Sequence, residues 1–153
     1  AEERWQVVHI TGTLDWPAVE AARQQLTSAG RARYHAFDYL HEDMGLALAA
    51  ADLVVSRAGA STLGEFPHFG LPAILLPYPH AWRYQAVNAD YLASRGAAIR
   101  LDDDRAGEEL FPTIRRLWDD PVMLQQMAAR SRALARPEGA QHVARLVMEL
   151  EAR

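Results

Sequence analysis

The sequence contains no cysteine among its 153 residues. Disulfide cross-links and thiolate metal ligands are therefore excluded, and so are the small secreted scaffolds that depend on them. Long apolar runs are also absent. The longest such stretches, residues 46–55 and 75–79, are too short or too interrupted to cross a bilayer, which takes about 20 residues. We expect a cytosolic protein without a transmembrane helix.

Positive charge is scarce as well. Lys and Arg number 16 against 20 Asp and Glu, so the formal net charge is -4. Nucleic-acid-binding domains normally carry clustered basic residues, and we therefore expect no nucleic-acid partner. The first residues, Ala1-Glu2-Glu3-Arg4, differ from the basic and then apolar start of a signal peptide, so the sequence predicts no export signal.

The remaining composition is that of a packed globular protein. Apolar residues make up 50% of the chain and charged residues 24%, which is ordinary for a folded domain. The length is enough for one hydrophobic core. We expect a single domain spanning residues 1–153.

Short aliphatic runs alternate along the chain with longer amphipathic segments. This alternation is typical of βα units, so we expect an α/β fold with a Rossmann-like parallel sheet flanked by helices. The expected strands are a buried one at residues 6–11 and others at 33–37, 52–56, 73–76 and 98–101. The expected helices span residues 15–29, 84–94, 106–118, 121–135 and 140–151. Two more are expected between them: one that begins at residue 42 or 43, and a separate one that ends at residue 69.

Helix boundaries are marked by local signals. Asp15 is a candidate N-cap with Pro17 in the first turn, and Gly30 and Gly70 are expected to end helices. The last helix carries one apolar stripe suited to packing across a domain, formed by Val143, Leu146, Val147 and Leu150.

Ligands of open α/β sheets bind beyond the carboxyl ends of the strands, so the residues that follow each strand are the candidate site. The first group, Gly59, Ala60, Ser61 and Thr62, begins a helix whose N–H groups and dipole favour phosphate. Small residues at such a turn also let the backbone approach a ligand. Judged alone, the same residues fit a capped, tightly packed turn equally well.

Two further groups follow strands. Glu65, one turn into that helix, has a carboxylate able to bind both hydroxyls of a ribose, although a solvated helix residue is the simpler interpretation by itself. Residues 79–85, with Asn88 one turn on, collect aromatic, amide and cationic side chains that suit a sugar. The three acidic residues 102–104 follow the last expected strand, where we expect a solvated polar turn rather than a metal site.

These groups occur together in an order that closely resembles the carboxyl-terminal domain of the MurG family. The resemblance is carried by residues 51–65, residues 69–77, His80, Gln85 and residues 88–89, and it extends over nearly the whole chain. It implies one half of a GT-B glycosyltransferase. The family transfers N-acetylglucosamine from UDP-N-acetylglucosamine to undecaprenyl-pyrophosphoryl-muramoyl-pentapeptide, a step of peptidoglycan synthesis.

The resemblance also implies roles for individual residues. Glu65 matches the carboxylate that holds the ribose, and residues 59–62 match the helix entrance beside the diphosphate and sugar. Leu40 matches the residue whose backbone pairs with uracil, within a slightly longer loop, and Gln85 matches a glutamine that binds the sugar hydroxyls. Tyr84 stands where the family usually has a polar His or Gln. The remaining matches are to positions typical of the family: Arg57, His80 and Asn88.

Several expectations about the whole protein follow from the resemblance. The family pattern implies an inverting displacement with no metal and no cofactor, in which this chain contributes donor binding and no catalytic residue. It implies an amino-terminal acceptor-binding domain as partner, through which the lipid-linked acceptor is reached at the inner face of the cell membrane. The chain starts after the family's first strand and phosphate loop, so we expect that strand to be lacking and the chain alone to be inactive.

Three alternatives remain open. One is a related transferase with another UDP-sugar or lipid acceptor, such as a diacylglycerol galactosyltransferase. The second is a non-catalytic UDP-sugar-binding subunit that needs a separate partner, as in the two-subunit transferase of the dolichol pathway. The third is an α/β domain with a degenerate, empty site.

Overall fold

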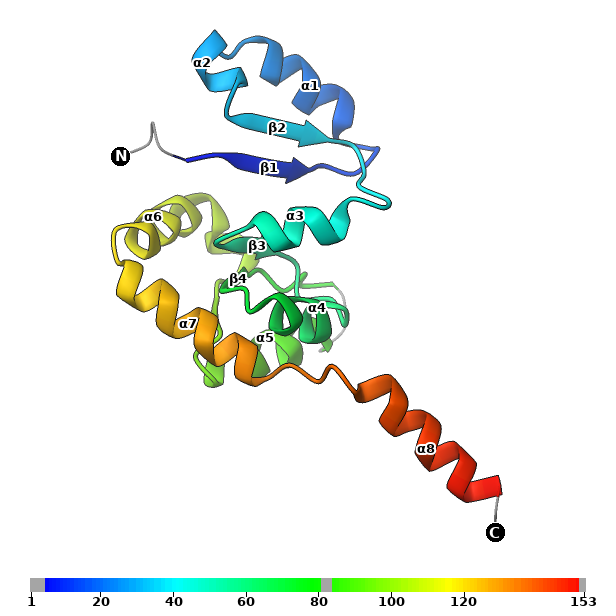
Figure 1. Cartoon of the computed structure of the whole chain (residues 1–153). Helices are drawn as coiled ribbons and strands as arrows, with labels where there is room; N and C mark the ends of the chain where they lie inside the picture. Colours follow the sequence, from blue (N-terminus) through cyan, green and yellow to red (C-terminus); the bar gives the residue numbers. More distant parts are fainter. Residues whose placement is uncertain (1–4, 81–83, 152–153) are drawn as a thin grey trace. The chain divides into compact units, whose positions relative to one another are not determined.

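The structure is a computed structural model that describes residues 5–80 and 84–151 (Figure 1). The chain divides into two compact units, Ala1–Ala49 and Ala50–Arg153. Each is built from parallel strands joined by helices, which confirms the predicted α/β class. We describe each unit by itself.

The first unit is a βαβ arrangement followed by a helix. Strands β1 (Val7–Ile10) and β2 (Tyr34–Phe37) pair in parallel from Val7↔Tyr34 to Ile10↔Phe37. The crossover contains helices α1 (Trp16–Gln24) and α2 (Ser28–Arg31). Helix α3 (Met44–Ala50) follows β2. Parallel strands need such a crossover, because the chain must return to the end at which the first strand began before the second strand can start, and a two-residue turn cannot do this.

Two expectations about this unit are wrong. The segment 15–29 is not one helix, because α1 ends at Gln24 and the Thr27 side chain accepts a hydrogen bond from the N–H of Gly30 at 3.1 Å, which caps a new helix. Gly30 therefore lies inside α2 instead of ending α1. Strand β1 is not buried either, since all four of its residues are exposed, whereas the two crossover helices pack on β2.

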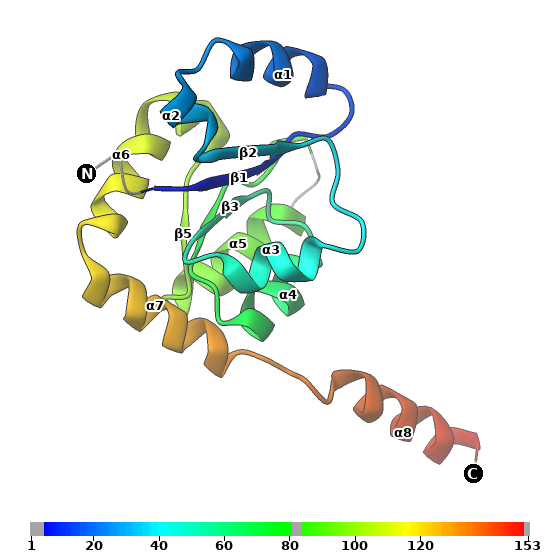
Figure 2. The same cartoon turned by 45° about the horizontal axis from the view of Figure 1, so that its top comes forward.

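The second unit contains a three-stranded parallel sheet in the order β3-β4-β5, with β4 in the centre. Figure 2 labels its two outer strands, β3 and β5. The strands are β3 (Val54–Ser56), β4 (Ala73–Leu75) and β5 (Ala98–Arg100). Helix α4 (Thr62–Phe69) connects the first two, and α5 (Tyr84–Ser94) connects the last two. Every residue of β4 is buried, as its central position requires.

The carboxyl-terminal part of this unit is helical. A 3-10 turn, η2 (Asp103–Arg105), leads into α6 (Ala106–Trp118), and α7 (Pro121–Ala133) packs against both α6 and α4. The buried apolar cluster joins the sheet to these helices. Its members are Ile74, Leu76, Leu101, Leu117 and Met127.

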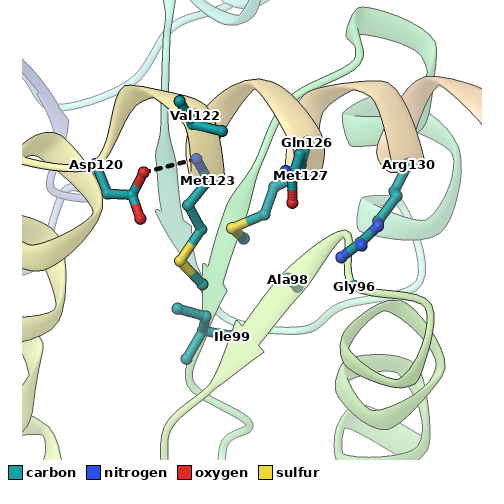
Figure 3. A pocket seen from close by; sticks show the side chains of 9 residues that line it. All are labelled: Gly96, Ala98, Ile99, Asp120, Val122, Met123, Gln126, Met127 and Arg130. Carbon is teal, nitrogen blue, oxygen red and sulfur yellow. Dashed lines mark hydrogen bonds between the residues drawn. The ribbon is translucent and has the colours of Figure 1, made fainter.

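Two glycines end helices in the left-handed conformation. Gly70 after α4 has φ +66° and Gly96 after α5 has φ +68°, as glycine allows without a Cβ penalty. Arginines of α7 lie directly over them, and Figure 3 shows Arg130 reaching toward Gly96 beside an open cavity of about 350 Å³ between α7 and β5. Arg132 lies over Gly70 in the same way.

The last helix, α8 (Gly139–Glu151), keeps its apolar stripe exposed. Val143, Val147 and Leu150 are among the exposed large apolar side chains of the chain. None of the helices within residues 5–80 and 84–151 combines the length and apolar character that a bilayer crossing requires.

Candidate functional site

The candidate site of the second unit lies at the carboxyl edge of its sheet. Strands β3, β4 and β5 end at Ser56, Leu75 and Arg100, and because all three are parallel these ends share one edge. The loops that follow them contain most of the residues predicted from the sequence. This is the edge at which open α/β sheets bind their ligands.

The loop after β3 is fixed by contacts on both sides. Thr62 closes the turn, because its hydroxyl donates to the carbonyl of Gly59 at 2.7 Å and its N–H donates to the same carbonyl at 3.2 Å. Ser61 is the N-cap of α4 but makes no side-chain cap bond, and its side chain, like that of Ala60, is exposed. The small side chains at the helix entrance therefore leave the first turn of α4 open to a ligand.

Asn88 of α5 ties this loop to the next helix. Its Nδ2 donates to the carbonyl of Ala58 at 3.0 Å, and Ala58 is fully buried. A buried carbonyl that lost this donor would have little access to water as a replacement. Asn88 thus links the loop after β3 to helix α5, a role that its sequence position did not reveal.

We predict that Asn88→Ala lowers the free energy of unfolding by about 1–3 kcal/mol, because the buried carbonyl of Ala58 loses its donor. Urea unfolding followed by circular dichroism would measure the change. Ser94→Ala, on the exposed end of the same helix, is the control and is expected to shift the value by under about 0.5 kcal/mol. An Asn88→Ala chain as stable as the control would contradict the assignment.

Gln85 spans the loop after β4. Its Oε1 accepts a hydrogen bond from the backbone N–H of Tyr78 at 2.9 Å. Since the amide oxygen holds the backbone, the amide nitrogen is the group that can donate to a ligand hydroxyl. We therefore expect Gln85 to act as a hydrogen-bond donor in the predicted sugar contact.

Arg57 links the ends of all three strands. It follows β3, its Nη1 donates to the carbonyl of Leu76 at the end of β4 at 3.2 Å, and the same atom pairs with Oδ1 of Asp103 after β5. Its Cζ lies 5.4 Å from the centroid of the Tyr78 ring. The sequence predicted Arg57 but missed Asp103 and Tyr78, although both follow strands as the other site residues do.

Three other predicted residues, Glu65, His80 and Tyr84, are exposed. Glu65 lies in the first turn of α4, and the Tyr84 side chain at the start of α5 is 72% exposed. His80 contacts the ring of Tyr78 edge-on, with centroids 5.5 Å apart. Residues 81–83, which the sequence placed in the same sugar-binding group, lie outside the described residues. Leu40 belongs to the first unit, where it is half-buried in the loop after β2.

Beyond the ends of β4 and β5 lies an open pocket of about 710 Å³. Arg100 binds the carboxylates of Asp90 at 2.7 Å and Asp102 at 3.0 Å, and these two hydrogen bonds raise its pKa. Asp102 and Asp103 are thus ion-paired, which the expected solvated turn did not include. Among the residues described, no group of three His, Asp or Glu side chains is arranged to hold a metal ion. The pocket is lined by Pro77, Tyr78, Pro79, Ala86, Arg100, Asp102, Asp103 and Asp104.

The parallel sheets, the open helix entrance and the polar carboxyl edge define the class of Rossmann-like ligand-binding domains. Residues 1–143 match the family model described as "Glycosyltransferase family 28 C-terminal domain". The chain belongs to this family, and its fold is that of the carboxyl-terminal half of a GT-B glycosyltransferase.

Similar proteins agree with this assignment. The chain is 41% identical to the UDP-N-acetylglucosamine--N-acetylmuramyl-(pentapeptide) pyrophosphoryl-undecaprenol N-acetylglucosamine transferase of Roseiflexus sp. strain RS-1, over 95% of this chain and 37% of that protein. The crystal structure of MurG from Acinetobacter baumannii matches with a TM-score of 0.79 and 28% identity, over 94% of this chain and 41% of that chain. The glycosyltransferase VinC, solved with dTDP, shares the fold at a TM-score of 0.68 and 21% identity.

These matches confirm the resemblance to the MurG family. The chain spans about two fifths of the length of the curated relatives it matches. The roles of the individual site residues stay predictions.

Proposed function

We propose that the chain binds UDP-N-acetylglucosamine as the donor-binding domain of an inverting glycosyltransferase that acts on a lipid-linked muramoyl-pentapeptide. The names of the similar transferases support the donor and acceptor. The observation that carries the proposal is the open entrance of α4, where Thr62 and Asn88 hold the loop and Glu65 follows in the first turn.

The proposed binding mode follows from the chemistry of this entrance. The diphosphate would lie at the first turn of α4, where N–H groups and the helix dipole favour negative charge. The carboxylate of Glu65 would accept hydrogen bonds from the two ribose hydroxyls. The amide nitrogen of Gln85 would donate to a hydroxyl of the sugar, across the loop after β4.

In the proposed reaction, a hydroxyl of the muramoyl group attacks the anomeric carbon and the bond to UDP breaks on the opposite face. The chain's part is to orient the donor and to stabilise the charge that develops on the departing diphosphate through fixed N–H dipoles and Arg57. The attacking hydroxyl loses its proton to a base outside this chain. This scheme requires neither a metal nor a separate cofactor.

In this proposal, other parts of the protein bind the acceptor and contact the membrane. We propose an amino-terminal domain as the partner that binds the lipid-linked acceptor, at the cytoplasmic face of the membrane. A second candidate function, a UDP-sugar-binding subunit completed by a separate chain, needs the same donor site and differs only in how the acceptor domain is supplied.

The first test is the affinity of the purified chain for UDP-N-acetylglucosamine, measured by calorimetry beside UDP-galactose. We predict saturable binding that prefers the acetylglucosamine donor. Glu65→Ala is expected to weaken it at least about tenfold, since hydrogen bonds to a charged group contribute roughly 1.5–3 kcal/mol.

Glu108→Ala is the matched control, because Glu108 is also an exposed glutamate in the first turn of a helix, α6, and does not line the pocket beyond β4 and β5. It should bind as the unaltered chain does. No binding by the unaltered chain, or equal losses in the two variants, would overturn the proposed site. A preference for UDP-galactose would reassign the donor and leave the site in place.

A further inference from the structure

The guanidinium of Arg57 is held through one nitrogen. Nη1 donates both to the carbonyl of Leu76 and to the carboxylate of Asp103. Within residues 5–80 and 84–151, Nε and Nη2 of Arg57 donate no hydrogen bond. The side chain is 49% exposed. An arginine has five N–H donors in a rigid fork, so one anchored nitrogen fixes the direction of the others.

Both anchors of Nη1 are themselves fixed. Leu76 is 7% exposed and belongs to the apolar cluster beneath the sheet edge, so its carbonyl cannot move independently. Asp103 begins the turn η2, which is closed by the N–H of Arg105 donating to the carbonyl of Asp102 at 3.1 Å. A flexible side chain on the β3 loop is thereby attached to the ends of both β4 and β5.

We propose that Asp103 is a positioning residue of the donor site: it orients Arg57 so that its remaining N–H groups face the diphosphate of the nucleotide sugar. This inference rests on the proposed function. Asp103 acts through Arg57 and does not contact the ligand, since a carboxylate would repel the diphosphate. The effect is a lower cost of ordering Arg57 when the donor binds.

The opposite arrangement would be a counter-ion that competes with the donor. If Asp103 occupied the ligand-facing side of the guanidinium, the diphosphate would have to displace it, and its removal would tighten binding. The geometry favours positioning, because the carboxylate shares Nη1 with a backbone carbonyl and the Tyr78 ring lies 5.4 Å from the Cζ atom. These contacts use Nη1 and one face of the guanidinium, and they leave the N–H groups of Nε and Nη2 for a ligand.

The test is a double-mutant cycle on the affinity for UDP, with uridine as the ligand that lacks the diphosphate. Arg57→Ala and Asp103→Ala are each expected to weaken UDP binding, the second by about three- to tenfold, the range that the ordering of one long side chain spans. Uridine binding should be unchanged in both. In the Arg57→Ala background, Asp103→Ala should have no further effect, because its only route to the ligand is gone.

Two more variants separate positioning from net charge. Glu108→Gln removes one negative charge from the first turn of α6, outside the lining of the pocket beyond β4 and β5, and should leave UDP affinity unchanged. Asp103→Glu, which can still reach a guanidinium, should recover part of the lost affinity. Thermal unfolding of each variant verifies that the fold is retained, and Asp103→Asn replaces Asp103→Ala if the latter does not fold.

The outcomes are distinguishable. If the unaltered chain binds UDP and Asp103→Ala binds it equally well or more tightly, the positioning role is overturned and the proposed function stays intact. A loss in Asp103→Ala that persists in the Arg57→Ala background, or that extends equally to uridine, also overturns it. Absence of UDP binding by the unaltered chain removes the proposed function and this inference together.

Discussion

Leu117→Ala is expected to lower the free energy of unfolding by about 2–5 kcal/mol, the range for deleting a buried leucine side chain. Leu117 is 0% exposed and faces the sheet from α6 within the cluster that also contains Ile74 and Met127. The substitution removes one methine and two methyl carbons from this cluster, and the neighbours on a short parallel sheet can collapse only partly into the space. Urea unfolding at equilibrium, followed by circular dichroism, measures the loss.

The matched control is Val122→Ala on the neighbouring helix α7, whose side chain is 61% exposed. It should change stability by under about 0.5 kcal/mol. Equal effects of the two substitutions would mean that the cluster between the sheet and α6 is not the packed core of this unit.

Most elements of the second unit were predictable because residues that end helices and strands, glycine and proline, lie at their boundaries. Helix α5 spans Tyr84–Ser94 as expected, since Gly96 stops it and an aliphatic run follows. Strand β4 is similarly bounded by Gly70 and Pro77. Such local signals act within a few residues, so they are legible without knowledge of the fold.

The errors in the first unit have tertiary or competing local causes. The apolar pattern of residues 15–29 continues past Gln24, but Thr27 offers its hydroxyl as a cap and begins α2. Strand β1 was expected to be buried because an aliphatic run is typical of a central strand. Its burial depends on which helices pack over it, and the crossover helices pack mainly on β2.

The site was predictable as a set of loops, but its contacts were not. The rule that ligands bind at carboxyl strand ends placed Gly59, Gln85 and Asn88 at one edge from sequence alone. The bond between Arg57 and Asp103 joins residues 46 positions apart. It depends on the strand order β3-β4-β5, which periodicity does not specify. The same holds for the amide of Gln85, whose oxygen holds the backbone of Tyr78.

Gly70→Ala is expected to destabilise the chain by about 2–3 kcal/mol, the sum of a backbone cost and a smaller contact cost. The backbone there has φ +66°, a conformation that costs an L-residue roughly 1–2 kcal/mol. A Cβ at this position would also lie 2.7 Å from Nε and 2.8 Å from Nη2 of Arg132, which is well inside normal contact. The α7 arginine must therefore move away from the end of α4. Because the obstructing atoms are the far end of a flexible, exposed side chain, this movement falls at the low end of the overpacking range, at roughly 1 kcal/mol.

Gly12→Ala separates the two costs. Gly12 has φ +76°, yet a Cβ built on it meets no atom within 4 Å, so this variant carries the backbone cost alone. Gly70→Ala combined with Arg132→Ala removes the obstruction and should recover the difference between the two single glycine variants, as read from urea midpoints. If Gly70→Ala costs no more than Gly12→Ala, then Arg132 yields freely and does not hold α7 against α4. If Gly70→Ala costs more than Gly12→Ala and Arg132→Ala relieves the difference, then Arg132 holds α7 against the end of α4. Gly70 is then the contact through which α7 fixes α4, the helix whose first turn forms the proposed donor site.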